Sequence, residues 1–156
     1  VMYSAHSKQN EIVCDIDSTL SEFFEGDEGK LKQVLLNVIN NAVKFTENGT
    51  ILISVKKISE NRIETEVEFK ISDTGIGIAP EIQGKLFQPF MQGDQSYTKK
   101  YQGTGLGLAI SYGIIKMHKG NITFVSEIGK GTTFKVVLPK HQAYQTNEAI
   151  EGAKAL

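Results

Sequence analysis

The stretch that decides the fold of this chain runs from residue 31 to residue 45 and reads LKQVLLNVINNAVKF. At about 100° per residue along a helix, its apolar side chains fall within one arc, which predicts a helix surface that faces a core. The side chains of this apolar arc are Leu31, Val34, Leu35, Val38, Ala42 and Phe45. A separate arc consists of polar side chains, namely Gln33, Asn37, Asn40, Asn41 and Lys44. The helix is expected to end within residues 46–49, with Gly49 beyond its last turn.

The polar arc of this helix is rich in asparagine, which is unusual for a surface that faces only solvent. Asparagine is a poorer helix former than Glu, Lys or Arg, and residues that oppose the local propensity are expected mainly at functional sites. Asn37 and Asn41 lie one turn apart, so their carbonyl oxygens could reach one hard cation together, with Lys44 at phosphate distance. The alternatives are a polar face that is merely rich in amides, or amides that hydrogen-bond to loop backbone.

Alternating apolar and polar residues after this helix, and a shorter run before it, predict strands. The clearest alternation covers residues 63–71 and is typical of an antiparallel strand with one solvated face. Shorter strands are predicted at residues 12–16, 51–55, 121–126 and 132–138, a turn at 59–62, and helices at 80–87 and 106–118. We therefore expect an α+β two-layer sandwich, in which a mixed, largely antiparallel sheet carries helices on one face.

Asp73 follows the predicted strand 63–71 and continues the parity of its inward-facing residues. Its carboxylate should therefore point into the layer between helices and sheet, where a charge without hydrogen-bond donors would be very costly. Gly75 and Gly77 come directly afterwards and permit a tight turn and close backbone approach. Either Asp73 caps the N–H groups of its own turn, or it accepts hydrogen bonds from the amino group of a ligand.

A second glycine-rich loop, GTGLGL at residues 103–108, leads directly into the predicted helix 106–118. Backbone N–H groups at a helix N-terminus form an anion site, and glycines let a phosphate approach. The loop is neither a Rossmann fingerprint, since a polar loop and not a strand precedes it, nor a P-loop. That long polar loop, residues 88–102, is expected to be a functional lid or disordered. Two glycine loops, an inward aspartate and an amide–lysine helix face together predict a purine nucleotide site with a divalent metal.

Composition narrows the class of protein further. The chain has 156 residues, 17 Lys and Arg against 18 Asp and Glu, and a single cysteine, Cys14. This length suits one domain, and the near-zero net charge argues against a module that binds nucleic acid through phosphate attraction. One cysteine excludes a disulfide framework and fits a reducing compartment. No run of apolar residues approaches the length of a membrane span, and residues 1–10 carry no signal-peptide pattern. The piece of protein that this sequence represents is therefore expected to be soluble.

Four segments resemble, in order and spacing, the N, G1, F and G2 boxes of the catalytic ATP-binding domain of two-component sensor histidine kinases. They are residues 33–46 (QVLLNVINNAVKFT), 73–77 (DTGIG), 87–90 (FQPF) and 103–108 (GTGLGL). The resemblance implies a Bergerat-type fold that binds ATP and Mg²⁺ and transfers a phosphoryl group to a histidine. Within this family, the lid at residues 92–100 and the closing hairpin at residues 126–134 are most similar to those of hybrid kinases. It divides the chain into an N-terminal segment (1–10), the catalytic ATP-binding domain (11–140) and a tail or linker (141–156).

By position, the resemblance also implies roles for single residues. Asp73 would bind the adenine amino group. Asn41 would be the main Mg²⁺ ligand with Asn37 assisting, and Lys44 would contact phosphate. The glycines of the second loop would shape the lid hinge and the triphosphate path, and the two phenylalanines of the F box would anchor the lid base. The full set of implied ATP-binding residues is Asn37, Asn41, Lys44, Asp73, Gly75, Ile76, Gly77, Phe90, Lys99, Gly103, Thr104, Gly105, Leu106, Gly107 and Leu108.

The chain departs from the family pattern at three points. Lys99 stands where the lid usually carries an arginine, and Gln102 replaces a frequent glycine; a lysine contacts phosphate less directionally than an arginine does. The histidines, His6, His118 and His141, all lack the context of a phosphoacceptor, which the family carries on a separate dimerisation helix. They are expected to be structural or solvated.

The resemblance further implies the partners of this domain. They are a dimerisation and phosphoacceptor domain of the same or a sister chain, and a downstream response regulator or receiver domain. No nucleic-acid partner and no membrane contact by this fragment are expected, and the setting would be the cytoplasm. ATP hydrolases of the same fold usually carry a glutamate at the position of Asn37, and an amide cannot act as a general base. The remaining alternatives are such a hydrolase, or a non-catalytic nucleotide-binding interaction module.

Overall fold

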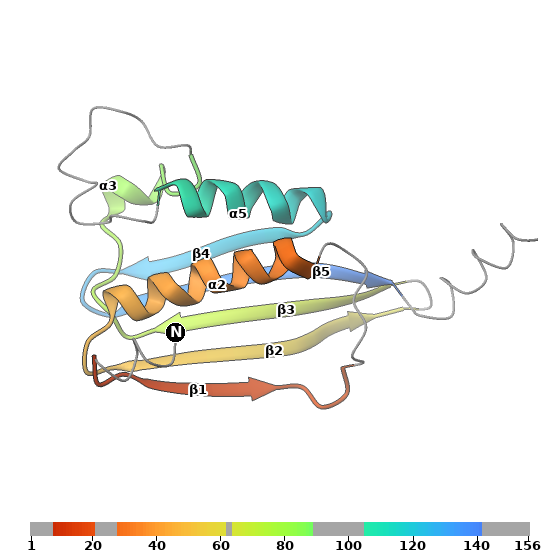
Figure 1. Ribbon diagram of the computed structural model, residues 1–156, viewed down its shortest axis with the longest axis horizontal. Coiled ribbons are helices and arrows are strands. Elements are labelled where there is room, and N and C mark those ends of the chain that lie inside the picture. The colour runs from red at the N-terminus through yellow and green to blue at the C-terminus, as the bar shows by residue number, and fades with distance from the viewer. Residues whose placement is uncertain (1–7, 21–27, 62–63, 89–104, 142–156) are drawn as a thin grey trace, which may run out of the picture.

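The structure is a computed structural model that describes residues 8–20, 28–61, 64–88 and 105–141. These residues form a five-stranded sheet with the strand order β1-β2-β3-β5-β4 (Figure 1). The strands span Glu11–Ile16 (β1), Thr50–Glu60 (β2), Glu64–Asp73 (β3), Asn121–Glu127 (β4) and Gly131–His141 (β5). β1 runs parallel to β2, and each of the other neighbouring pairs is antiparallel. The predicted two-layer fold with a mixed, largely antiparallel sheet is therefore confirmed.

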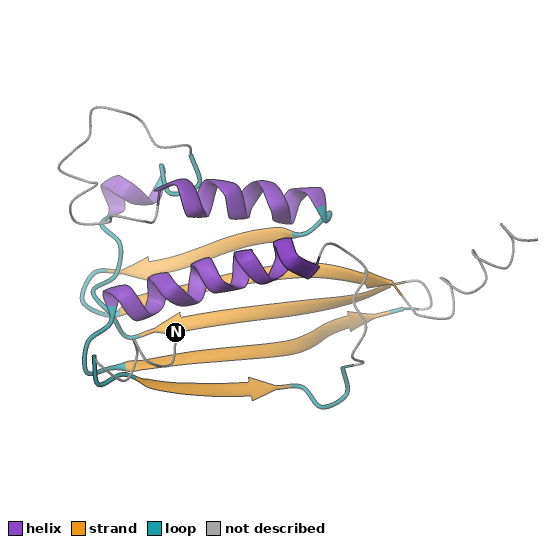
Figure 2. Cartoon of the chain, in the orientation of Figure 1, coloured by secondary structure: helices purple, strands orange, loops and turns teal. Residues whose placement is uncertain are grey.

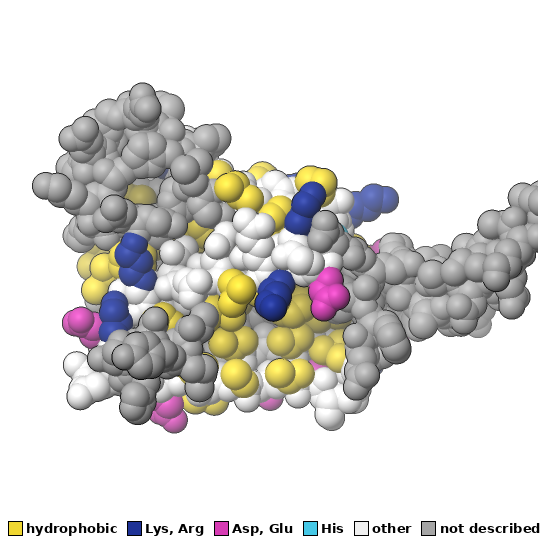
Figure 3. Space-filling view, in the orientation of Figure 1, with side chains coloured by type: hydrophobic (Ala, Val, Ile, Leu, Met, Phe, Trp, Pro, Cys, Tyr) yellow, Lys and Arg dark blue, Asp and Glu magenta, His cyan; other side chains and the backbone are white. Residues whose placement is uncertain are grey.

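Helices cover one face of the sheet (Figure 2). In the described part of the chain they are α2 (Glu28–Phe45), α3 (Pro80–Gln83) and α5 (Gly105–Met117). α2 packs on β3, α5 packs on β4, and the two helices pack against each other. The β1–β2 side of the sheet is less covered, and Figure 3 shows hydrophobic side chains gathered there below α2. None of the described helices is long and apolar enough to cross a bilayer.

The sequence prediction places each end of α5 (Gly105–Met117) within one residue, and larger differences occur at the start of α2 and the end of α3. α2 begins at Glu28, three residues before the expected start at Leu31, and thereby places an acidic side chain in its first turn, where the helix dipole favours negative charge. The predicted helix 80–87 is too long, because α3 ends at Gln83. Beyond that residue the chain continues in tighter turns that close over three residues, such as the bond from the Lys85 N–H to the Ile82 carbonyl at 2.9 Å.

The core lies between the helices and the β2, β3, β4 and β5 strands. From the predicted apolar arc of α2, Val34, Val38 and Ala42 are buried, whereas Leu31 and Leu35 are partly buried at the edge of the core. Val43, which is outside that arc, is also buried, at 3% exposure. Because α2 packs against α5 as well as against the sheet, its buried surface is wider than one stripe. On β3 the buried residues are all odd-numbered, as predicted, and are Thr65, Val67 and Ile71.

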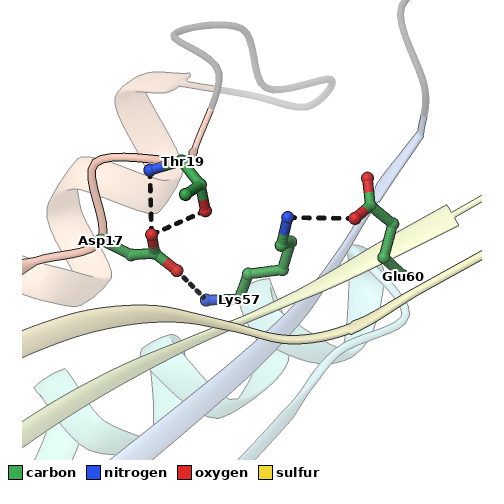
Figure 4. A network of polar contacts seen from close by, with 4 residues as sticks. All are labelled: Asp17, Thr19, Lys57 and Glu60. Atoms are coloured by element: carbon green, nitrogen blue, oxygen red, sulfur yellow. Dashed lines mark hydrogen bonds and ion pairs between the residues drawn. The ribbon is translucent and has the colours of Figure 1, made fainter.

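Asp17 turns the chain at the end of β1 (Figure 4). Its Oδ1 accepts hydrogen bonds from the Thr19 N–H at 2.9 Å and from the Thr19 hydroxyl at 2.7 Å, and its Oδ2 accepts one from the Lys57 N–H at 3.3 Å. The hydrogen bonds from Thr19 lower the pKa of this carboxyl, with a smaller effect from the Lys57 N–H. The bond to Lys57 fastens the turn to β2, at the residue where the register of the β2–β3 pair shifts.

Residues just outside both expected limits of the domain, 11 and 140, form part of the fold. Asn10 bridges the exit of α2, since its amide donates to the Thr46 carbonyl at 2.7 Å and its Oδ1 accepts from the Gly49 N–H at 3.1 Å. At the other end His141, expected in a polar tail, is the last residue of β5 and pairs with Glu64. The expectation that His141 lies in a tail was wrong, because β3 begins at Glu64 and its pairing extends β5 as far as His141.

Candidate functional site

A pocket opens between the end of α2, the loop after β3, and the strand β5. It holds about 400 Å³ of space, a volume that includes space open to solvent. Its lining residues are Asn41, Ala42, Phe45, Asp73, Gly77, Ile78, Leu86, Leu108, Thr132 and Phe134. Most of these side chains are apolar, so the few polar ones would decide the orientation of a bound ligand.

Asp73, the last residue of β3, provides the carboxylate of this pocket. Its Oδ1 accepts a hydrogen bond from the Gly75 N–H at 2.9 Å and one from the Thr132 N–H at 3.3 Å. Burial raises the pKa of the Asp73 carboxyl, although these two hydrogen bonds act in the opposite direction. Asp73 thus caps its own turn, as one interpretation of the sequence held. Both bonds end on Oδ1, so Oδ2 keeps its capacity to accept a hydrogen bond from a ligand.

The glycine loop after Asp73 lies close to the backbone of two other segments, the end of α2 and the end of β4. A Cβ atom on Gly75 would lie 2.3 Å from the Phe45 carbonyl oxygen, and one on Gly77 would lie 2.2 Å from the Glu127 carbonyl oxygen. Gly77 also has a φ of 75°, in the left-handed region that side chains disfavour. Between these glycines Ile76 stays 46% exposed. The close approach predicted for both glycines is present, and it is an approach to protein backbone.

The amides of α2 occupy different environments. Asn41 lines the pocket, whereas the Asn37 amide nitrogen lies 3.4 Å from the Ser111 hydroxyl of α5. Asn40 is exposed, and so is Lys44, whose Nζ lies 5.5 Å from the centroid of the Phe45 ring. The structure therefore brings one of the two predicted metal ligands into the pocket itself, next to Phe45, and holds the other one turn away against α5.

The second glycine loop reaches the pocket through the start of α5. This helix begins at Gly105, so Gly105, Leu106 and Gly107 form its first turn, and Leu108 lines the pocket at 1% exposure. The other predicted residues of this region, Phe90, Lys99, Gly103 and Thr104, lie outside the described residues, as does His6. The Nδ1 of His118 lies 2.8 Å from the Ile114 carbonyl oxygen near the end of α5.

Phe87, the aromatic residue that opens the F box, packs against two other aromatic rings. The Phe87 ring packs 5.5 Å from the Tyr112 ring and 5.6 Å from the Phe124 ring, centroid to centroid. These contacts join the segment after α3 to α5 and β4. The predicted lid itself, from residue 89 onward, lies outside the described part of the chain.

Thr132 and Phe134 of β5 are pocket residues that the sequence analysis did not single out. Thr132 lies directly opposite Asp73 in the β3–β5 pairing. The sequence did contain a signal for Thr132, since the GTTF run at residues 131–134 opens a predicted strand. That Thr132 pairs with Asp73, however, follows only from the register of two strands that are distant in the sequence.

The chain is similar to known proteins in both sequence and structure. Residues 26–142 match the model of a family described as histidine kinase-, DNA gyrase B-, and HSP90-like ATPase. The chain is 39% identical over 139 residues to hybrid signal transduction histidine kinase B of Dictyostelium discoideum. It is 40% identical over 132 residues to signal transduction histidine-protein kinase BarA of Escherichia coli strain K12. These alignments cover 89% and 85% of this chain, but only 7% and 14% of the relatives, so the chain spans a small part of their length.

Solved structures are similar over most of the chain. Full-length ShkA in complex with AMPPNP superposes with a TM-score of 0.73 and 36% identity, covering 90% of this chain and 28% of that one. The nucleotide-free catalytic domain of histidine kinase ThkA superposes with a TM-score of 0.71 and 29% identity, covering 89% of this chain and 86% of that one.

The chain therefore belongs to the family of histidine kinase-, DNA gyrase B- and HSP90-like ATPases. Within that family it is an ATP-binding catalytic domain of the sensor histidine kinase type, as the resemblance of its four boxes implied.

Proposed function

We propose that this chain binds ATP together with Mg²⁺ in the pocket beside Asp73, and that it supplies the γ-phosphoryl group to a histidine on a separate dimerisation domain. The observation that carries the proposal is the half-buried Asp73 carboxylate, whose Oδ1 is occupied by backbone N–H groups while Oδ2 can accept from a ligand. The exocyclic amino group of adenine is such a donor. The apolar lining around Asp73 suits the faces of a purine ring.

The residues around the pocket fit a magnesium–phosphate group. Mg²⁺ is held by few protein oxygens, and by phosphate and water for the rest. We assign this oxygen to Asn41, which lines the pocket, with Asn37 assisting, and Lys44 carries a positive charge at the end of the same helix. When bound, the metal neutralises charge on the triphosphate. The first turn of α5, from Gly105, and the residues Gly75, Ile76, Gly77 and Leu108 complete the proposed ATP site, together with Phe90, Lys99, Gly103 and Thr104.

The proposed acceptor is a histidine outside this chain. Phosphoryl transfer asks a catalytic domain mainly for positioning and electrostatic stabilisation, which the amide, lysine and helix N-terminus can provide. An amide at residue 37 cannot act as a general base, which disfavours self-contained hydrolysis. The proposed partners are a dimerisation and phosphoacceptor domain of the same or a sister chain and a response regulator or receiver domain, in the cytoplasm.

The decisive experiment replaces the carboxylate by its amide, Asp73→Asn. The carbonyl oxygen of the new amide can still accept the Gly75 and Thr132 N–H groups, but the second atom becomes a donor facing the donor of adenine. We expect the dissociation constant for ATP, measured by calorimetry, to rise at least about 100-fold with the circular dichroism spectrum unchanged. Asp15→Asn, which alters an exposed carboxylate on β1, is the control and should bind like the wild type. Unchanged ATP affinity in Asp73→Asn would refute the proposal.

A further inference from the structure

The turn between β4 and β5 lies directly against the glycine loop of the pocket. The Gly129 N–H donates to the Ile76 carbonyl at 2.9 Å, and the backbone of Glu127 leaves no room for a side chain on Gly77. The wall of the proposed nucleotide site is thus supported from behind by a hairpin that is distant in the sequence. Ser126, at the end of β4, is the residue at the centre of this support.

The Ser126 hydroxyl joins two parts of the pocket wall. It accepts a hydrogen bond from the Ile78 N–H at 2.8 Å and lies 2.7 Å from the Thr132 hydroxyl and 3.2 Å from the Gly131 carbonyl oxygen. A hydroxyl has one proton and two lone pairs, and this one has a partner for each. Ile78 and Thr132 both line the pocket, whereas Ser126 does not.

Gln83 of α3 contacts the same loop through the carbonyl group of Ile78. Its Nε2 donates to the Ile78 carbonyl at 2.8 Å and lies 3.3 Å from the Ser126 carbonyl oxygen. Ile78 is therefore fixed both at its N–H, by Ser126, and at its carbonyl, by Gln83. Thr132, the other partner of Ser126, donates its backbone N–H to Asp73. One hydroxyl thereby links the loop, the strand β5 and, through Thr132, the carboxylate that the proposed function requires.

We infer that Ser126 is a positioning residue for nucleotide binding, which sets the distance between the glycine loop and Asp73 through Ile78 and Thr132. The inference rests on the proposed function and adds a residue that does not touch the nucleotide. Binding sites tolerate displacements of only about 0.5 Å in their contact residues, so support of this kind is expected to affect affinity. Without the hydroxyl, the Ile78 N–H and the Thr132 hydroxyl lose a shared partner, and the two walls can move apart.

The test compares Ser126→Ala with Ser126→Thr, which keeps the hydroxyl, by calorimetry with AMPPNP and Mg²⁺. We expect Ser126→Ala to raise the dissociation constant about tenfold and Ser126→Thr to stay within about threefold of the wild type. Thr123→Ala, on the exposed side of the same strand, is the matched control and should leave binding unchanged. Amide NMR shifts of Ile78 and Thr132 should move together in Ser126→Ala and return in Ser126→Thr.

The outcomes separate the inference from the proposed function. Wild-type affinity in Ser126→Ala, or equal weakening in Ser126→Thr, would overturn the inference while the proposed function stands. Failure of the wild-type chain to bind AMPPNP would overturn both. If Ser126→Ala does not fold, Gln83→Ala tests the same support from the helix side: weaker AMPPNP binding supports the inference, and unchanged binding overturns it.

Discussion

Asp73 shows how a single residue in this domain combines a structural and a functional demand. It caps the turn that follows β3, and its burial in an apolar pocket raises its pKa. A raised pKa in an acid means that the folded state holds the proton more tightly than the unfolded chain does. The charge that the proposed adenine contact needs therefore costs stability, as is common at functional sites.

This cost predicts a pH-dependent difference in stability between the wild type and Asp73→Asn. At pH values below the unfolded-state pKa, Asp73 is protonated in both states and carries no penalty. As the pH rises through the window between the unfolded and the raised folded pKa, the folded wild type binds more protons than the unfolded chain, and its unfolding free energy falls. Asp73→Asn lacks this titration. The melting temperature of Asp73→Asn should therefore rise relative to that of the wild type as the pH increases through this window. A constant difference across this range would contradict the prediction.

The two candidate metal ligands predict unequal effects. Asn41 lines the pocket, whereas Asn37 lies against Ser111. We expect Asn41→Ala to weaken ATP binding about tenfold in the presence of Mg²⁺ and Asn37→Ala to weaken it less. In the absence of Mg²⁺, with a chelator, the two variants should differ little from the wild type. Asn40→Ala, on the exposed part of the same helix, is the control. Equal or reversed effects of Asn37→Ala and Asn41→Ala would show that the assignment of the main ligand is wrong.

At the scale of elements, the pocket is built by segments that approach one another closely through backbone. The end of α2 meets the glycine loop where the Ile76 N–H donates to the Phe45 carbonyl at 3.2 Å, and the β4–β5 turn meets it at Gly77. The positive φ of Gly77 and the absence of a Cβ atom are both required by this approach. The sequence pattern did not reveal that α3 ends at Gln83. The residues that follow form turns closed over three residues, and their sequence is also compatible with a helix.

Two glycines of this region predict opposite effects on stability. Gly77→Ala would place a Cβ atom 2.2 Å from the Glu127 carbonyl oxygen at a φ of 75°, whereas a Cβ atom on Gly84 would have nothing within 4 Å. Gly84 has a helical φ of −66°. We expect Gly77→Ala to lower the free energy of unfolding by more than about 1 kcal/mol and Gly84→Ala to leave it unchanged or raise it. Urea denaturation measures both, and equal stability of the two variants would contradict the account of this loop.

At the scale of the whole molecule, residues of α2, β3, α5 and β5 together line the pocket. Among the described residues, no histidine has the sequence context of a phosphoacceptor. Asn37 provides no general base for water attack, and the Nδ1 of His118 is engaged with the backbone of its own helix. The proposed function therefore has this domain present a phosphoryl group to an acceptor on another domain.

This arrangement predicts how the isolated chain behaves. The purified chain should hydrolyse ATP at a negligible rate in a phosphate-release assay and form no acid-labile phosphoprotein. Mixed with a dimeric helical fragment that carries a cognate phosphoacceptor histidine, it should phosphorylate that histidine, because positioning of the acceptor accounts for much of the rate. The Asp73→Asn chain is the negative control. Fast hydrolysis by the isolated wild type would favour the ATPase branch of the family, and self-phosphorylation would refute the account of its histidines.

Much of the fold and of the candidate site could be predicted because the signals are local. The period of β3 placed Thr65, Val67 and Ile71 in the core, and the same parity carried Asp73 to the pocket. Errors appeared where tertiary contacts override local patterns. Val43 is buried because α2 has two packing partners, and His141 is in β5 because its strand partner extends that far.

The sequence by itself determined most of the secondary structure, the inward face of β3 and the residue types of the proposed nucleotide site, since side-chain period and glycine chemistry act over a few residues. Only the tertiary structure decided which distant residues complete that site. Thr132 donates to Asp73 across 59 residues, Ser126 accepts from Ile78 across 48, and Asn10 holds the end of α2 across 36. Such bonds form when strand register and hairpin packing bring backbone groups together. A hydroxyl or amide that meets a partner in this way leaves no periodic signal in the chain, because its partner is set by the packing of whole elements.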